Sequence, residues 1–231
     1  QMPISTEEVE LFKENLPFKL TNAQERTIKE ISDDISLEKP MRRLVQGDVG
    51  SGKTVVAAVS MYISAKNNTQ SVLLCPTEVL AEQHFKNFSA WFKNSNIKIE
   101  LLTGKMPISK RRGIYQDLED GEIDILIGTH AVFQDKVKMK NLGLVVVDEQ
   151  QRFGVKQRFD LVKKSSDQIM PHQLFMTATP IPRTLAMTIF ADLETSKIDE
   201  LPPGRKPVET LVYSDTKHDE IVKRLETVCK S

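Results

Sequence analysis

Short runs of apolar residues alternate with amphipathic stretches through most of the chain. Runs typical of strands cover residues 44–45, 72–75, 123–127, 144–147 and 174–176, with a more alternating run at 97–102. Stretches typical of helices cover residues 54–66, 78–92, 109–120 and 155–164. Continuous β-branched runs are expected in strands covered on both faces, and strand–helix alternation implies right-handed crossovers between parallel strands. The pattern predicts one α/β domain over residues 21–200, with a mostly parallel sheet flanked by helices.

Two helices are expected before the first strand. Ser5 and Glu8 have the spacing of a capping box, which predicts a helix that ends before Pro17. Thr21 and Gln24 have the same spacing and predict a second helix, whose apolar face consists of Ile28, Ile31 and Ile35. Residues 1–20 are therefore expected to form an N-terminal helix and a lead-in to the domain.

The chain changes character after residue 200. Residues 201–207 contain three prolines and one glycine, which is typical of a linker. A strand is expected at 209–213 and a helix at 217–229, but one strand and one helix cannot bury a core. We therefore expect residues 208–231 to be the truncated start of a second domain, and the initial Gln1 to indicate a piece of a longer protein.

Charge and cysteine content exclude several classes of protein. The chain has 231 residues with 32 Lys and Arg against 32 Asp and Glu, so any binding to nucleic acid or anionic lipid must come from local patches. Its two cysteines, Cys75 and Cys229, cannot form a disulfide framework and indicate a reducing compartment. The apolar run at 144–147 is too short to span a bilayer, and the start lacks a signal-peptide pattern. These features predict a cytoplasmic protein without a membrane segment.

Residues 47–54 read Gly-Asp-Val-Gly-Ser-Gly-Lys-Thr and lie between an expected strand and an expected helix. This is the G-x-x-x-x-G-K-[ST] pattern in the context that makes it specific for nucleoside triphosphates. Glycines let backbone N–H groups converge on phosphate oxygens, and the helix directs its positive end toward the same anion. Lys53 is expected to contact the β- and γ-phosphates, and Thr54 to ligate Mg²⁺. The residues expected to contact ATP in this loop are Gly47, Gly50, Ser51, Gly52, Lys53 and Thr54.

The run at 144–147 ends in two carboxylates, Asp148 and Glu149. Ligands of open α/β sheets bind at the carboxyl ends of strands, so these acids are expected beside the phosphate loop, on a neighbouring strand tip. Asp148 would hold Mg²⁺ through its water shell, and Glu149 would orient or deprotonate the attacking water. Taken alone, two acids at a strand end are equally consistent with a role in solvating that end.

Two further turns follow expected strands. Thr177 and Thr179 follow the run at 174–176, and their hydroxyls would reach the acid pair if the two strands are adjacent. Thr129 and His130 follow the run at 123–127, where Thr129 would either contact a nucleic-acid phosphate or have no role.

A third turn and two basic clusters are candidates for nucleic-acid contact. Pro76 and Thr77 precede a helix, whose N-terminus is either simply capped by Thr77 or binds a phosphate. Basic residues gather at 105–112 and again at 136–140. Such clusters are more often solvated faces than DNA grooves.

Together these segments resemble the ordered motifs of superfamily 2 helicases. The phosphate loop and residues 76–78, 128–130, 148–151 and 177–179 would be motifs I, Ia, Ic, II and III of the first RecA-like lobe. Longer strings at residues 16–24, 47–57, 76–84, 152–155 and 179–185 resemble the RecG family of bacterial branch-migrating DNA helicases. The transcription-repair coupling factor, a related duplex DNA translocase, has similar motifs, but residues 76–84 and 201–207 look more like RecG.

The resemblance implies roles for several residues. Gln24 would bind the adenine with Phe18 packed nearby, although a glutamine that only caps its helix is at least as consistent with the sequence. Gln151 stands where the family usually has His, and would couple ATP to DNA without being able to titrate near neutral pH. Thr177 and Thr179 would share that coupling role. The residues expected to contact DNA are Pro76, Thr77, Thr129 and His130.

The resemblance also implies an activity and a domain organisation. Residues 21–200 would be lobe 1 of a motor that uses ATP and Mg²⁺ to remodel or branch-migrate forked or junction DNA in recombination and repair. Residues 208–231 would begin lobe 2, which supplies the arginine finger in this class, so the chain alone is expected to hydrolyse ATP slowly. Two other classes stay open, a P-loop small-molecule kinase and a non-catalytic nucleotide-dependent binding module.

Overall fold

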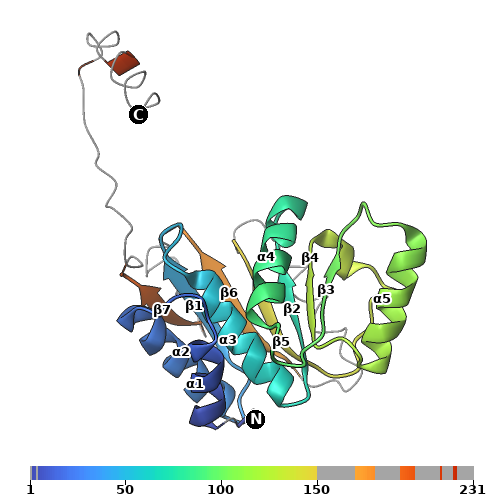
Figure 1. Cartoon of the computed structure of the whole chain (residues 1–231), viewed down its shortest axis with the longest axis horizontal. Coiled ribbons are helices and arrows are strands. Elements are labelled where there is room, and N and C mark those ends of the chain that lie inside the picture. Colours follow the sequence, from blue (N-terminus) through green and yellow to red (C-terminus); the bar gives the residue numbers. More distant parts are fainter. Residues whose placement is uncertain are drawn as a thin grey trace.

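A parallel β-sheet forms the centre of the chain (Figure 1). The computed structural model describes residues 2–3, 5–149, 170–179, 193–200, 214 and 221–222. Within them, seven strands pair in the order β3-β4-β2-β5-β6-β1-β7, and every pairing is parallel. The strands are β1 (Arg42–Gly47), β2 (Gln70–Leu74), β3 (Ile99–Leu102), β4 (Ile125–Gly128), β5 (Leu142–Val147), β6 (His172–Thr177) and β7 (Glu194–Ile198). The helices are α1 (Thr6–Glu14), α2 (Asn22–Ile35), α3 (Lys53–Lys66), α4 (Glu78–Trp91) and α5 (Ile108–Asp120), with a 3₁₀ turn, η1, at His130–Phe133.

The predicted α/β class is confirmed, and the six strands predicted within residues 21–200 match β1 to β6. The strand predicted at 209–213 lies outside the described residues, as does most of the helix predicted at 217–229. The helices predicted at 54–66, 78–92 and 109–120 correspond to α3, α4 and α5, whereas the one predicted at 155–164 lies outside the described residues. Strand β7 was not predicted. It is one of the two edge strands of the described sheet, and only Ser196 and Ile198 are buried in it, so its sequence lacks the apolar run that marks the central strands.

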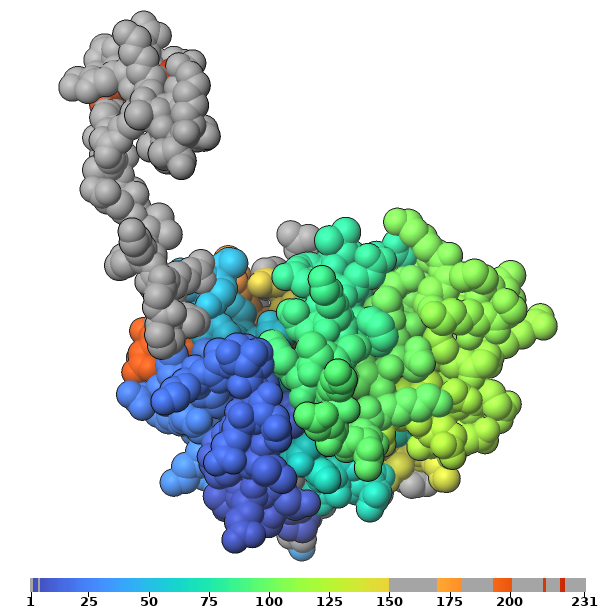
Figure 2. All heavy atoms as spheres, in the orientation of Figure 1, coloured from blue at the N-terminus to red at the C-terminus, as the bar shows by residue number. Residues whose placement is uncertain are grey.

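Alternating strand residues build two cores, one on each face of the sheet. On one face, residues such as Leu73 and Val146 pack in the same cluster as the buried side chains of α1 to α4. On the other face, Val72 and Val147 join the cluster that contains the buried residues of α5. Figure 2 shows the first face, where the N-terminal helices and α4 hide most of the sheet. Both faces of the central strands are therefore covered, which explains their continuous apolar sequence.

The two N-terminal helices begin at the predicted caps. Ser5 accepts a hydrogen bond from the Glu8 amide at 3.2 Å and caps α1. Thr21 and Gln24 form a complete capping box at the start of α2. The predicted apolar face of α2, formed by Ile28, Ile31 and Ile35, is buried. Local sequence thus fixed where both helices start.

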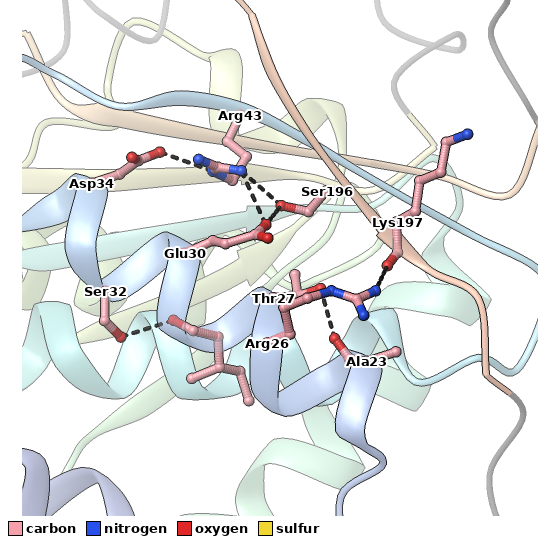
Figure 3. Close-up of polar contacts among 10 residues, drawn as sticks. Ala23, Arg26, Thr27, Glu30, Ser32, Asp34, Arg43, Ser196 and Lys197 are labelled. Atoms are coloured by element: carbon pink, nitrogen blue, oxygen red, sulfur yellow. Dashed lines mark hydrogen bonds and ion pairs between the residues drawn. The ribbon is translucent and has the colours of Figure 1, made fainter.

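A buried arginine joins α2 to the sheet (Figure 3). Arg43 of β1 donates through Nε to Asp34 at 2.8 Å and through Nη1 to Glu30 at 3.2 Å, both on α2. Its Nη1 also donates to the Ser196 hydroxyl of β7 at 2.7 Å. Because only 7% of Arg43 is exposed, its charge requires these partners, and they hold α2 in register with β1 and β7.

Residues at and after the end of β7 are attached to the first half of α2. Arg26 donates to the Lys197 carbonyl at 3.0 Å and to the Asp199 carboxylate at 3.1 Å. The Glu200 carboxylate accepts from the Ala23 amide at 3.1 Å, at the N-terminus of the helix. A carboxylate is favourable there because it meets the unpaired N–H groups of the first turn.

Across the described segments, every helix falls short of the length and apolarity that a membrane-spanning segment requires.

Candidate active site

The residues predicted to bind phosphate and Mg²⁺, to activate water and to couple through Thr177 lie at the carboxyl ends of three consecutive strands, β1, β6 and β5. Gln46 of β1 pairs in register with Thr177 of β6, and Phe175 of β6 pairs with Val147 of β5. The condition that the Thr177 strand be adjacent to the acid strand is therefore met. One expectation was wrong, because the acid strand is not the neighbour of the phosphate-loop strand. Strand β6 lies between them, which places Thr177 in the middle of the site.

The phosphate loop joins β1 to α3 through two left-handed glycines. Gly50 has φ 76° and Gly52 has φ 90°, conformations that residues with a Cβ adopt at a cost. A Cβ on Gly52 would also collide with Nε2 of Gln24. Helix α3 begins immediately afterwards at Lys53, so its unpaired N–H groups point into the same loop.

The Lys53 ammonium lies within this loop. Its Nζ donates to the carbonyls of Gly47 at 2.6 Å and Asp48 at 2.9 Å. Burial lowers the pKa of Lys53, and the nearby carboxylates of Glu149, Asp148 and Asp48 oppose that shift. The phosphate loop follows β1 and the acid pair follows β5, so the lysine and the acids both lie at the carboxyl ends of the parallel strands.

The loop residues fit a triphosphate with its divalent ion. Ser51 is 1% exposed, and its hydroxyl has no hydrogen-bond partner among the residues that the structure describes. A buried hydroxyl without a partner is costly unless a ligand satisfies it. Thr54 is half-buried in the first turn of α3, one residue after Lys53, where its hydroxyl is available to a hard cation.

Gln24 links the start of α2 to the phosphate loop. Its Oε1 accepts from the Thr21 amide at 2.9 Å, and its Nε2 donates to the Ser51 carbonyl at 2.8 Å. The residue is 3% exposed. The capping role is thus confirmed, and in this conformation the amide holds the loop. Adenine binding by Gln24 stays a prediction.

Phe18 is half-exposed on the segment between α1 and α2. Its ring meets Trp91 of α4 edge-on, with centroids 5.6 Å apart. It also lines an open groove of about 600 Å³ together with residues such as Leu20 and Glu25. An aromatic side chain that lines a groove can pack against a planar base. The contact of Phe18 with adenine stays a prediction.

Asp148 is held by two contacts beyond its own strand. Its amide donates to the Leu74 carbonyl of β2 at 2.9 Å. Its Oδ2 lies 3.0 Å from Nε2 of His84 on α4, and both side chains are largely buried. The neighbouring Glu149 has φ 51°, in the left-handed region, and this conformation is unusual for a residue other than Gly, Asn or Asp. Such backbone strain is typical of functional sites.

Thr177 and Thr179 form a small hydroxyl turn after β6. Their hydroxyl oxygens are 3.0 Å apart, and the Thr179 amide donates to Thr177 Oγ1 at 3.2 Å. Thr177 is fully buried and Thr179 is exposed. A turn with one hydroxyl inside and one outside can transmit a change at the nucleotide to the surface, which is consistent with the predicted coupling role. Gln151, the third predicted coupling residue, lies outside the described residues.

The residues predicted to contact DNA lie at the carboxyl ends of β2, which neighbours the acid strand β5, and of β4, which lies beyond β2. Thr77 caps α4 by accepting from the Leu80 amide at 3.3 Å, and it is exposed, as is His130. Pro76 is half-buried before it, whereas Thr129 is buried, with 6% exposed. The capping role of Thr77 is confirmed, and DNA contact by the four residues stays a prediction.

The two basic clusters contact different elements. In the first, Lys105 forms an ion pair with Glu78 of α4 at 2.9 Å. In the second, Lys140 donates to the Asp120 carbonyl at 3.1 Å, and Lys138 lies 3.8 Å from Glu119. The second cluster thus binds the C-terminal turn of α5, where cations are favourable.

His84 is the site residue that sequence reasoning missed. It belongs to the buried stripe of α4, with Ala81 three residues before it and Phe88 four residues after it. A histidine in an apolar stripe was the available signal, since a buried imidazole requires a polar partner. Sequence alone did not identify that partner as Asp148.

Comparisons with known proteins agree with this geometry. The sequence model of the DEAD/DEAH box helicase family matches residues 21–188. The ATP-dependent DNA helicase RecG of Aquifex aeolicus is 51% identical over 217 residues, which cover 94% of this chain and 27% of that protein.

Solved structures agree as well. A structure of RecG bound to a three-way DNA junction superposes with a TM-score of 0.85 at 41% identity, over 97% of this chain and 30% of that one. The yeast DEAD-box splicing factor Prp28 shares the fold, with a TM-score of 0.62 at 20% identity, over 99% of this chain and 56% of that one. The chain thus spans less than a third of the RecG proteins, and the resemblance to them is confirmed. With its motif residues at the ends of adjacent parallel strands, the chain belongs to the DEAD/DEAH box helicase family.

Proposed function

We propose that this chain is the ATP-binding motor lobe of a RecG-type DNA helicase, which couples ATP hydrolysis to the remodelling or branch migration of forked or junction DNA in recombination and repair. One observation carries the proposal. The phosphate loop with Lys53 follows β1, Thr177 ends β6 and Asp148–Glu149 follow β5, so the three groups lie at the carboxyl ends of three consecutive parallel strands. The similarity to RecG proteins, including one bound to a three-way junction, supports the choice of DNA substrate.

The phosphate loop would bind the triphosphate. In this proposal, Lys53 exchanges its contacts with the Gly47 and Asp48 carbonyls for phosphate oxygens, and the amides of the loop and the first turn of α3 complete the cradle. Ser51 would direct its unpaired hydroxyl to the same ligand. The adenine would lie toward Gln24 and Phe18, at the start of α2.

The acid pair would serve hydrolysis. Thr54 and Asp148 would hold the Mg²⁺ that accompanies ATP, which neutralises charge on the phosphates. Glu149 would orient the attacking water and accept its proton. Thr177, between the loop and the acids, would sense whether the γ-phosphate is present and pass the change to Thr179.

The DNA-facing residues would lie on the other half of the sheet. Strand β2, which leads to Pro76 and Thr77, is the direct neighbour of the acid strand β5, and β4, which leads to Thr129 and His130, is the next strand. A change at the nucleotide site would reach the DNA contacts where β2 pairs with β5.

By the same resemblance, residues 1–20 would be a lead-in, 21–200 the first lobe, 201–207 a linker and 208–231 the start of the second lobe.

The test is nucleotide binding and hydrolysis by the chain and two variants. Lys53→Ala should lower the affinity for Mg·ATP by about tenfold or more, because it removes charge-assisted contacts to phosphate, each of which contributes about 1.5–3 kcal/mol. Glu149→Gln should bind Mg·ATP normally but lose hydrolysis by about 10²-fold or more. Lys66→Ala, at the exposed far end of α3, is the matched control and should change neither quantity.

The proposal is contradicted by two results. If Glu149→Gln hydrolyses ATP as fast as the wild type, the acid pair does not activate water, and a nucleotide-dependent binding module is the better description. If the wild type transfers phosphate from ATP to a metabolite and DNA has no effect on the full-length protein, a small-molecule kinase is the better description.

A further inference from the structure

His84 is a buried polar residue on the apolar side of α4. It is 7% exposed, and its ring stacks on Phe88 with centroids 6.4 Å apart. An aliphatic side chain would fill such a site without the cost of burying two ring nitrogens. The presence of an imidazole therefore requires a polar partner that compensates this cost.

Within the described part of the chain, that partner is Asp148. Nε2 of His84 lies 3.0 Å from Oδ2 of Asp148. The other ring nitrogen, Nδ1, has no hydrogen-bond partner among the described residues. All the polar contact recorded for His84 is thus directed at one oxygen of one carboxylate. His84 contacts Oδ2, so the imidazole does not occupy Oδ1 of the same carboxylate.

The contact connects Asp148 to the unit formed by β2 and α4. The Asp148 amide already donates to Leu74, the last residue of β2, at 2.9 Å. His84 adds a side-chain contact from the helix that follows β2. The carboxylate is therefore fixed at both its backbone and its side chain by the same unit, which limits the rotamers that it can adopt.

We propose that His84 is a positioning residue that orients the Asp148 carboxylate for Mg²⁺, and that the chain requires a higher Mg²⁺ concentration to bind nucleotide when this contact is lost. The proposal rests on the proposed function, in which Asp148 holds Mg²⁺. Hydrogen-bond partners that orient a metal-binding side chain typically change metal affinity by about 10–100-fold when they are removed. His84 itself would touch neither the metal nor the nucleotide.

Two amide substitutions separate positioning from packing. The side-chain nitrogen of Gln can occupy the place of Nε2 and donate to Asp148. Asn can reach only the place of Nδ1, which has no partner among the described residues. His84→Gln should therefore preserve the contact, and His84→Asn should lose it, although both variants carry the same functional group. Phe88→Leu is the matched control, because it disturbs the same stripe of α4 without removing a group bonded to Asp148.

The experiment measures binding of a fluorescent, non-hydrolysable ATP analogue to the chain as Mg²⁺ is titrated. We expect His84→Asn to raise the half-saturating Mg²⁺ concentration by about tenfold or more, with His84→Gln close to the wild type. Phe88→Leu should lower the thermal midpoint but leave the Mg²⁺ requirement unchanged. If His84→Asn does not fold, His84→Leu fills the apolar site without a donor and should show the same increase.

Equal Mg²⁺ requirements in His84→Asn, His84→Gln and the wild type would overturn the proposal. So would equal increases in both variants, because packing alone would then explain them. Wild-type binding that shows no dependence on Mg²⁺ is a separate outcome, which would overturn the proposed function and this inference with it.

Discussion

Gln24 uses the two ends of one amide for two different elements. Its oxygen completes the cap of α2, and its nitrogen holds the Ser51 carbonyl of the phosphate loop. The conformation of the loop is thus connected to the helix that precedes it, over 27 residues of sequence. Because the amide is buried, each of these contacts leaves an unpaired backbone group when it is lost.

Replacing Gln24 with Leu should lower the free energy of unfolding by about 2 kcal/mol or more. The Thr21 N–H and the Ser51 carbonyl would both lose their recorded partner, at about 1–3 kcal/mol for each group that stays buried. Urea denaturation measures the change. Thr21→Ser, which keeps a capping hydroxyl, is the control and should stay within about 0.5 kcal/mol of the wild type. A Gln24→Leu chain as stable as the wild type would show that water replaces both contacts.

Two arginines attach α2 to the sheet edge in different environments (Figure 3). Arg43 is 7% exposed and reaches Asp34, Glu30 and Ser196. Arg26 pairs with Asp199 at 3.1 Å, with 52% and 66% of the two side chains exposed. Solvent strongly screens the pair of Arg26 and Asp199. Removing Arg43 would leave Asp34 and Glu30 without the buried cation that they contact.

Arg43→Met should therefore destabilise the fold by about 2–4 kcal/mol, close to the cost of breaking a buried ion pair. Arg26→Met should cost at most about 1 kcal/mol, as exposed pairs do. Chemical denaturation of both variants at low and high salt measures the difference. Equal losses in the two variants would mean that burial does not determine the strength of these contacts.

His172, at the start of β6, makes stability depend on pH. Its Nδ1 accepts from the Met41 amide at 2.9 Å, and burial lowers its pKa from 6.5 to about 4. Between these values the unfolded chain binds a proton that the folded chain does not, so the free energy of unfolding rises with pH from about 4 to about 6.5 and then levels off.

The free energy of unfolding should depend less on pH in His172→Gln, because the glutamine side chain binds no proton between pH 4 and pH 6.5. Denaturation midpoints measured between pH 4 and pH 7.5 test this. A wild-type profile that is as flat as that of His172→Gln would show that His172 titrates equally in the folded and unfolded chains.

At the scale of the molecule, the proposed roles divide the sheet into two halves. Strands β1, β6 and β5 carry the proposed nucleotide site, and β2 and β4 carry the proposed DNA contacts. The halves meet where Asp148 bonds to Leu74 and His84. In helicases of this class a second lobe closes on the nucleotide, and an arginine finger is worth about 10³–10⁵ in the rate of phosphoryl transfer.

The chain alone should therefore bind Mg·ATP but turn it over slowly, with little stimulation by DNA. Full-length RecG of Aquifex aeolicus, assayed in parallel with forked, linear duplex and single-stranded DNA, should be faster by a factor on the order of 10³ or more. If this lobe belongs to a RecG-type helicase, the full-length protein that contains it should also be stimulated most by forked DNA. Robust DNA-stimulated hydrolysis by the chain alone, abolished by Lys53→Ala, would show that this lobe is sufficient.

The sequence determined the features that depend on neighbouring residues. Capping residues set the starts of α1 and α2, β-branched runs set the central strands, and the glycine spacing set the phosphate loop with Lys53 at the start of α3. These are local effects of backbone conformation and side-chain period, so they can be read without knowing the fold.

Only the tertiary structure decided which of these elements became neighbours. Contacts between distant parts of the chain decide three features. They place β6 between β1 and β5, they add the polar β7 at one edge of the sheet, and they bring His84 to Asp148. The physical reason is that crossovers and packing select one strand order among several that the same local patterns allow. The side chains that meet at the strand ends are set by that choice.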